Sequence, residues 1–322
     1  MIRYLQFPTE VYIMERILTV AQVILPIFAT VFLGLLARKK NLITPEGVQG
    51  LQQFVMNIGL PCVIFNSVLT AKVGLESLGI MAMLFPFMLG VTLWAFRSSK
   101  KRFPYRNLPM MFCAQESGML GIPLFMILFG SAQAYHMAIL DLTQAIVTHP
   151  TIAILSSDSG ENPKAGQILK KVFTSPLVVM CLIALALNLS GGGVWLDQIG
   201  IGPVITEATG FLGQPVSALM IFSVGYNFSL SEGNRRDIFK LCIVHLLTFA
   251  VIGGVLQLGL FLLPNITSTA RWAVLLYSFL PASYIAPSLG RTEQEHTVAS
   301  GVCSLLTVIT LIVFCAITAI IA

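Results

Sequence analysis

One acidic residue, Glu116, stands inside a hydrophobic stretch that glycine and proline interrupt, residues 115–123 (Gln-Glu-Ser-Gly-Met-Leu-Gly-Ile-Pro). A charged side chain at the centre of a bilayer costs roughly 2.5–3.5 kcal/mol on insertion scales, and such residues usually mark an ion or substrate path. A charged Glu116 would repel an organic anion, whereas a protonated one, or one neutralised by Na⁺, would not. We therefore expect Glu116 to take up a proton or a cation. The alternative is a glutamate that faces a water-filled cavity or bonds to a neighbouring helix.

A second acid, Asp141, lies in the next hydrophobic stretch together with Gln144 and His149. Asp141 and Gln144 are three residues apart, so they share one face of a helix. Asp141 is therefore a second candidate for proton or cation coupling. The same spacing also fits a simple pair between Asp141 and Gln144, or a bond between helices. His245 stands alone in an apolar stretch and is interpreted as a core residue.

A second interrupted stretch, residues 280–287 (Leu-Pro-Ala-Ser-Tyr-Ile-Ala-Pro), lies in the corresponding position of the second half. A broken helix at bilayer depth exposes backbone groups that lipid cannot satisfy, so it must face protein, water or a ligand. We expect both stretches to split into half-helices. Their N-termini would attract an anion, and their C-termini and freed carbonyls would instead attract a cation. Paired breaks of this kind indicate the binding site of a secondary transporter.

Neutral side chains near the breaks offer further hydrogen-bonding groups, although Ser117 and Ser283 equally well cap broken helix ends. The candidate substrate-binding residues are Asn57, Gln115, Glu116, Ser117, Gly118, Pro123, Pro281, Ser283 and Tyr284. The candidate crossover and kink residues are Pro61, Gly121, Pro123, Pro215, Pro281 and Pro287. No metal site is expected, because the six cysteines are far apart in apolar stretches and form no Cys/His pair at metal spacing.

The composition is that of an integral membrane protein. Of 322 residues, 56% are hydrophobic and 10% are charged, whereas a soluble domain carries about 25% charge. The net charge of +5 comes from short basic clusters beside the apolar stretches, which suits membrane orientation rather than nucleic acid binding.

Ten apolar stretches approach the ~20 residues that a bilayer-spanning helix needs. The expected spans are 16–37, 47–70, 76–96, 107–130, 134–155, 172–190, 203–229, 241–263, 271–290 and 297–321. If the N-terminus is outside, fifteen lysines and arginines fall in inside segments and four in outside segments, so both termini are expected outside. Ten spans divide into a first five-helix repeat (1–155), a cytoplasmic connector (156–171) and a second repeat (172–322). Because each half has an odd number of spans, the second repeat enters the membrane inverted.

Five short stretches, in order along essentially the whole chain, resemble the auxin efflux carrier family. They are residues 25–28 (Leu-Pro-Ile-Phe) with Gly34 and the basic turn 38–40, residues 57–65, residues 116–124, residues 220–225 and residues 280–287. The family includes the plant PIN-formed auxin carriers and bacterial permeases described as malate or malonate transporters.

The resemblance implies a fold similar to that of sodium–bile acid symporters. In that fold, crossed broken helices (spans 4 and 9) hold the substrate in a transport domain, which moves like an elevator against a scaffold domain. It also implies organic anion transport and a homodimer formed through the scaffold. In the plant carriers an asparagine stands five residues before the glycine of the Gly-Ile-Pro element, where this chain has Glu116 before Gly121. The short connector resembles that of bacterial permeases, which implies the plasma membrane, here a bacterial inner membrane.

We therefore expect an all-α membrane permease for a small organic anion such as a carboxylate, with proton coupling as one option. The alternative is a sodium-coupled symporter of the bile-acid type. A channel is less supported, and so is an enzyme, because the sequence has no H-E-x-x-H, G-x-S-x-G or paired-carboxylate motif. The expected partners are the substrate and the lipid bilayer, and no cofactor is expected beyond a coupling H⁺ or Na⁺.

Overall fold

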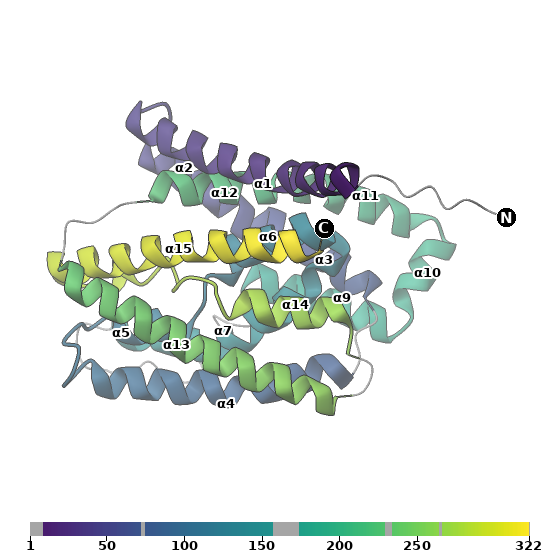
Figure 1. The fold of residues 1–322 in the computed structure, drawn as a ribbon. Helices are drawn as coiled ribbons and strands as arrows, with labels where there is room; N and C mark the ends of the chain where they lie inside the picture. The colour runs from purple at the N-terminus through teal and green to yellow at the C-terminus, as the bar shows by residue number, and fades with distance from the viewer. Residues whose placement is uncertain (1–8, 72–74, 157–173, 229–233, 264–265, 322) are drawn as a thin grey trace.

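The computed structural model describes residues 9–71, 75–156, 174–228, 234–263 and 266–321, and every element named within them is a helix (Figure 1). The first half contains α1 (Thr9–Lys39), α2 (Pro45–Phe54), α3 (Leu60–Thr70), α4 (Leu75–Ser98), α5 (Leu108–Cys113), α6 (Ile122–Phe129) and α7 (Ala134–Ser156). The second half contains α9 (Pro176–Leu189), α10 (Gly192–Gln198), α11 (Ile201–Gly213), α12 (Val216–Asn227), α13 (Arg235–Gly259), α14 (Ser268–Tyr277) and α15 (Glu293–Ile321). The expected connector, apart from Ser156, lies outside the described residues.

Six helical segments of the described chain are long and apolar enough to cross a membrane. They are Val20–Lys39, Pro45–Thr70, Ser77–Ser98, Ile201–Asn227, Arg235–Leu262 and Glu293–Ile321. The bent pair formed by α9 and α10, with 79° between its members, would be a seventh. Large apolar side chains face outward on these segments, among them Leu25, Phe32, Phe211 and Leu247, as lipid-facing side chains do. The chain is a multi-pass membrane protein.

Two π-helical turns, Val55–Gly59 and Ser117–Gly121, each lie just before a proline. In the first, the amide of Leu60 bonds to the carbonyl of Val55, five residues back. The next residue, Pro61, has no amide hydrogen, so the regular helical bonding pattern cannot pass through it. The turn before Pro123 has the same form. Pro215 instead falls between α11 and α12.

The helices pack into two groups, and each group draws on both halves of the chain. In the first group α1 packs along α12, α3 packs on α9 and α11, and α2 and α10 join them. In the second group α4 packs on α5 and α7, α13 packs on α14 and α15, and α6 packs on α7. The two groups meet where α12 contacts α6, α1 contacts α15 and α3 contacts α7. In Figure 1, α1, α2 and α12 lie along the top, and α4 and α13 lie along the bottom.

Candidate functional site

The two interrupted stretches lie directly against each other within the second packing group. Helix α5 ends at Cys113, and the chain is not helical again until the turn Ser117–Gly121 leads into α6. Between them, Gln115 forms an antiparallel β-bridge with Ala282 of the second stretch. The structure therefore places side by side two segments that are more than half the chain apart in sequence.

Backbone hydrogen bonds hold the two stretches together. The amide of Glu116 donates to the carbonyl of Pro281 at 2.8 Å, and the amide of Ser283 donates to the carbonyl of Ala114 at 3.2 Å. Backbone groups that the breaks remove from helical bonding are thus satisfied across the bridge, as they must be away from water.

The expectation of two half-helices is wrong for the second stretch. Helix α14 ends at Tyr277, and the chain beyond it forms turns and the short 3₁₀ turn Pro287–Leu289. Pro281 and Pro287 both lack an amide hydrogen, and the few residues between them are too short a segment to form a helix of their own. The first stretch does divide into two helical parts, α5 and the segment Ser117–Phe129.

The carboxylate of Glu116 accepts hydrogen bonds from both stretches. Its Oε2 accepts from the amide of Tyr284 at 2.7 Å, and its Oε1 accepts from the amide of Met119 at 3.3 Å. The second bond makes Glu116 the N-cap of the turn Ser117–Gly121. The side chain is 7% exposed. Glu116 therefore has a structural role: it caps the turn Ser117–Gly121 and links the first stretch to the second through the amide of Tyr284.

Gln144 of α7 is the centre of a buried polar network. Its Oε1 accepts from the amide of Gln115 at 2.9 Å and from the hydroxyl of Tyr277 at 2.7 Å. Its Nε2 lies 2.8 Å from the carbonyl of Gln115, 2.7 Å from Oγ of Ser117 and 3.0 Å from Oδ1 of Asp141. The hydroxyl of Ser117 also donates to Oδ1 of Asp141. The pairing of Asp141 with Gln144, one of the three interpretations given for Asp141, is present in the structure.

His245 of α13 also contacts the paired stretches. Its position in the sequence, as a lone histidine in an apolar stretch, did not indicate this contact. Its Nε2 lies 2.9 Å from the side-chain amide of Gln115. When that amide is oriented so that its nitrogen faces acceptors, it donates to His245 and to the carbonyls of Leu280 and Pro281. The imidazole is buried and its ring lies 4.6 Å from that of Phe249. His245 is thus a core residue, as expected, but one that helps to place Gln115.

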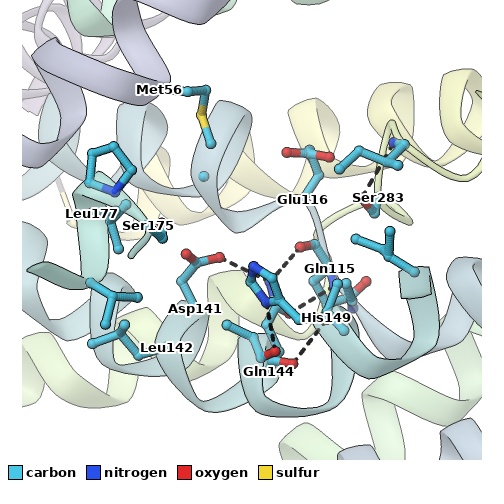
Figure 2. Close-up of a pocket in the computed structure, with 18 of the residues that line it drawn as sticks. Met56, Gln115, Glu116, Asp141, Leu142, Gln144, His149, Ser175, Leu177 and Ser283 are labelled. Carbon is cyan, nitrogen blue, oxygen red and sulfur yellow. Dashed lines mark hydrogen bonds between the residues drawn. The ribbon is translucent and has the colours of Figure 1, made fainter. Parts of the chain in front are cut away.

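A cavity of about 240 Å³ lies beside the paired stretches, between the two packing groups. Its polar lining consists of Asn57, Gln115, Glu116, Asp141, Gln144, Thr148, His149, Ser175 and Ser283. In Figure 2, Met56 and Glu116 lie above Asp141, His149 and Gln144. The first packing group contributes Met56, Asn57 and the start of α9, and the second group contributes the rest. The site is therefore lined by residues of both packing groups.

Most of the candidate substrate-binding residues lie around this cavity. Asn57, Gln115, Glu116, Gly118 and Ser283 line it, and so does the coupling candidate Asp141. The other candidates do not line it. Ser117 is buried in the protein. Pro123 lies in α6, and the carbonyl of Pro281 accepts from the amide of Glu116. Tyr284 lines a second cavity.

Sequence reasoning did not identify Thr148, Ser175 or Tyr277. Thr148 lies seven residues after Asp141, on the same helix face, so helical spacing could have indicated it. Ser175 precedes α9 on a distant part of the chain, and Tyr277 reaches Gln144 through a tertiary contact. No local pattern in the sequence marks either contact.

The second cavity, of about 280 Å³, lies between α12 and α15 on the other side of Tyr284. Its lining includes Asn227, Tyr284, His296, Ser300 and Cys303. Like the first, it lies between the two packing groups. The paired stretches are thus flanked by space on two sides.

The cavity beside Glu116 carries acids but few groups that can be positive. The residues described as its lining include Glu116, Asp141 and His149 but neither lysine nor arginine. Nδ1 of His149 lies 2.9 Å from the carbonyl of Ala145, so this nitrogen bears a proton and Nε2 is left for other partners. Within the described residues, no group of three or more His, Cys, Asp or Glu side chains is placed to hold a metal ion. An anion here would rely on backbone amides and neutral side chains.

Neither the models of known protein families nor the curated proteins contain a match to this sequence.

Proposed function

We propose that this protein is a secondary transporter that moves a small organic anion, such as a carboxylate, across the plasma membrane by alternating access. One observation carries the proposal. Two interrupted stretches from opposite halves of the chain are bonded to each other by their backbones, beside a polar cavity between two packing groups. Irregular backbone at membrane depth is tolerated where it is buried in protein or lines a cavity, and transporters place substrate sites at such breaks.

The proposal includes a ten-span topology of two inverted repeats. The six long apolar segments are joined in this count by the segment 107–130, by α7, by α9 and by the segment 271–290. Corresponding spans carry prolines, Pro61 with Pro215 and Pro123 with Pro281. The pairing of the fourth and ninth spans through Gln115 and Ala282 supports this symmetry.

The movement proposed is that of an elevator, in which the second packing group carries the site and the first stays fixed. Both cavities lie between the groups, and each group is internally well packed. This division supports the proposed membership of the auxin efflux carrier family, whose fold has a scaffold domain and a transport domain. A homodimer formed through the first packing group is part of the same proposal.

The orientation proposed places both termini outside the cell. Three helix ends lie together at one end of the molecule, on the left in Figure 1: the end of α1 and the starts of α13 and α15. Basic residues stand at or next to these ends, namely Lys39, Arg235 and Arg291. Basic residues at one end of a helical bundle favour the cytoplasmic side.

The substrate class follows from the size and chemistry of the cavity. Its volume, about 240 Å³, is below the roughly 300–1,000 Å³ of sites for drug-sized ligands, which favours a small molecule. The neutral side chains of the lining and the N-terminus of the segment Ser117–Phe129 favour a carboxylate.

A sodium-coupled symporter is the second candidate. The observation that favours it is the presence of two acids, Glu116 and Asp141, in the lining of one cavity without a basic neighbour other than His149. Hard cations such as Na⁺ prefer carboxylate and carbonyl oxygens, and both are present here.

Counterflow in proteoliposomes tests the proposal. Vesicles loaded with unlabelled malonate, malate or an aromatic acid are diluted into the same labelled compound at trace concentration. A carrier gives a transient, saturable accumulation of label, whereas a channel gives only equilibration. Absence of accumulation for every acid tested, with protein shown to be folded and inserted, would contradict the proposal. Repeating the assay with Na⁺ replaced by choline separates the two candidates.

A further inference from the structure

The carboxylate of Glu116 already occupies donors from both interrupted stretches. Its bond to the amide of Tyr284, at 2.7 Å, has the length of a strong charge-assisted hydrogen bond. Its bond to the amide of Met119 is longer, at 3.3 Å. The side chain also lines the 240 Å³ cavity. One carboxylate thus lies at the edge of the cavity, held by two backbone N–H groups that come from different parts of the chain.

Neither Tyr284 nor Met119 lines the cavity itself, so an incoming carboxylate would reach these two amides only in place of the carboxylate of Glu116. No lysine or arginine is among the described residues that line the cavity, so the donors available to an anion are backbone N–H groups, neutral side chains and His149. Bonds from N–H to a carboxylate are roughly twice as strong as neutral ones. The amide of Tyr284 cannot make its short bond to Glu116 and to a second carboxylate at the same time.

We propose that Glu116 is a tethered occupant of the position that the substrate's carboxylate takes, and that a small carboxylate binds by displacing it from the amides of Tyr284 and Met119. This inference rests on the proposed function, because it assumes that the transported molecule carries a carboxylate. No covalent bond changes in the exchange. The displaced side chain turns into the cavity, where Asp141 and His149 lie.

The exchange has a direct chemical consequence. Changing Glu116 to alanine removes Cγ, Cδ and both carboxylate oxygens, which together are the heavy atoms of acetate. Acetate in solution should therefore fill the vacated position and restore the bonds to Tyr284 and Met119. The parent protein has its own carboxylate in this place and should respond much less.

The first experiment measures the thermal midpoint of purified Glu116→Ala and of the parent protein against acetate and, as a neutral match in shape, acetamide. We expect the variant to melt below the parent, acetate to raise its midpoint saturably, and acetamide to leave it unchanged, since binding to the folded state stabilises by mass action. Equal responses of the variant and the parent to acetate would overturn the proposal. So would equal responses of the variant to acetate and acetamide.

The matched control is Glu295→Ala. Glu295 is also buried and its carboxylate also accepts backbone N–H bonds from two segments, at Arg106 and Arg291. It does not line the cavity beside Glu116. Its loss should lower the midpoint, but should leave the Kd of malonate, measured by calorimetry, as it is in the parent.

A second variant keeps the proposal testable if Glu116→Ala does not fold. Glu116→Gln preserves the size of the side chain and one acceptor oxygen but removes the charge. The incoming anion then competes with a neutral acceptor, so we expect the Kd of malonate, measured by calorimetry, to fall by about fivefold to tenfold. An unchanged or higher Kd would overturn the proposal.

The failure of this proposal and that of the transport proposal give different results. Rescue by acetate without counterflow would retain the carboxylate position and reject transport. Counterflow without rescue by acetate, and with the same Kd in Glu116→Gln, would retain transport and reject the tethered occupant.

Discussion

The side-chain amide of Gln144 pairs with the backbone of Gln115 as a neighbouring β-strand would. The amide of Gln115 donates to Oε1 of Gln144 at 2.9 Å, and Nε2 of Gln144 donates to the carbonyl of Gln115 at 2.8 Å. The bridge to Ala282 uses the amide of Glu116 and the carbonyl of Ala114, so the polar groups of Gln115 itself point the other way. Gln144 thus holds the first stretch in its extended form from the side opposite the second stretch.

Replacing Gln144 with leucine should therefore destabilise the fold. Leucine has a similar volume but leaves the buried amide of Gln115 without its partner, at a cost of about 1–3 kcal/mol. The carbonyl of Gln115 keeps the amide of Ser117 as a donor, at 2.8 Å. We expect a lower thermal midpoint and a loss of counterflow. The control is Gln198→Leu at an exposed position of α10, where the effect should stay within about 0.5 kcal/mol. Equal midpoints for the two variants would show that Gln144 does not support the paired stretches.

Many of the helices could be predicted from the sequence, because length and hydropathy are local properties. The expected spans 16–37, 47–70 and 297–321 correspond to long apolar helices in the structure. The break in the second stretch was also predictable, because Pro281 removes a backbone donor shortly after α14 ends at Tyr277. The break in the first stretch, between Cys113 and Ser117, lies well before Pro123.

The shape of the second break was not predictable in the same way. Broken spans in membrane proteins generally consist of two half-helices, so the sequence favoured a second half-helix after Pro281. In the structure, Pro281 and Pro287 are too close together for a half-helix to form between them. The pairing of the breaks through Gln115 and Ala282 is a tertiary contact, and nothing in either stretch alone marks its partner. The bond between Glu116 and the amide of Tyr284 is of the same kind. The only feature of the sequence that pointed to Glu116 was that it is an acidic residue within an apolar stretch.

Glu116→Gln tests whether this acid couples transport to protons. In proteoliposomes with an imposed pH gradient, we expect the variant to lose the proton-driven part of uptake, because a carboxamide does not exchange a proton. Counterflow, which needs no gradient, should persist. The control is Glu207→Gln, which changes an exposed acid of α11 in the same way. Unchanged proton-driven uptake in Glu116→Gln would rule out this role and leave Glu116 as a cap and tether.

Tyr105, between α4 and α5, makes the stability of the protein sensitive to high pH. Its hydroxyl donates to Oδ2 of Asp237 at 2.5 Å. Burial, together with this carboxylate, raises the pKa of Tyr105 to about 12, from an ordinary value of about 10. The unfolded chain therefore loses this proton at lower pH than the folded chain, so the stabilisation is complete below about pH 10 and is lost as the pH rises through about 12.

The measurement compares the thermal midpoints of the parent protein and Tyr105→Phe at pH 9 and pH 11. At pH 9 the parent should be the more stable, because phenylalanine cannot donate to Asp237. The difference in thermal midpoint between the parent and the variant should be smaller at pH 11. Only the parent loses stability there, because the variant has no hydroxyl proton at this position. A difference that stays constant between the two values would contradict the link between Tyr105 and Asp237.

Gly225→Ala should separate α1 from α12 in the first packing group. A Cβ atom at Gly225 would lie 2.1 Å from the carbonyl oxygen of Val31, and one at Gly34 would lie 2.2 Å from that of Phe222. Both obstacles are backbone atoms, which cannot rotate away as a side chain can, so the helices must move apart. Overpacking of this kind typically costs about 1–3 kcal/mol, and we expect a correspondingly lower thermal midpoint.

Gly254→Ala in α13 provides the matched control, because nothing lies within 4 Å of a Cβ atom at that glycine. There the substitution only removes the conformational freedom of a helical glycine and should stabilise by roughly 0.5–1 kcal/mol. The two changes are chemically identical and both fall inside helices, so opposite signs would isolate the effect of helix contact. A midpoint for Gly225→Ala at or above that of Gly254→Ala would show that α1 and α12 do not meet backbone to backbone. The first packing group, which is proposed to stay fixed while the second moves, would then lack the contact between α1 and α12 that holds its two halves together.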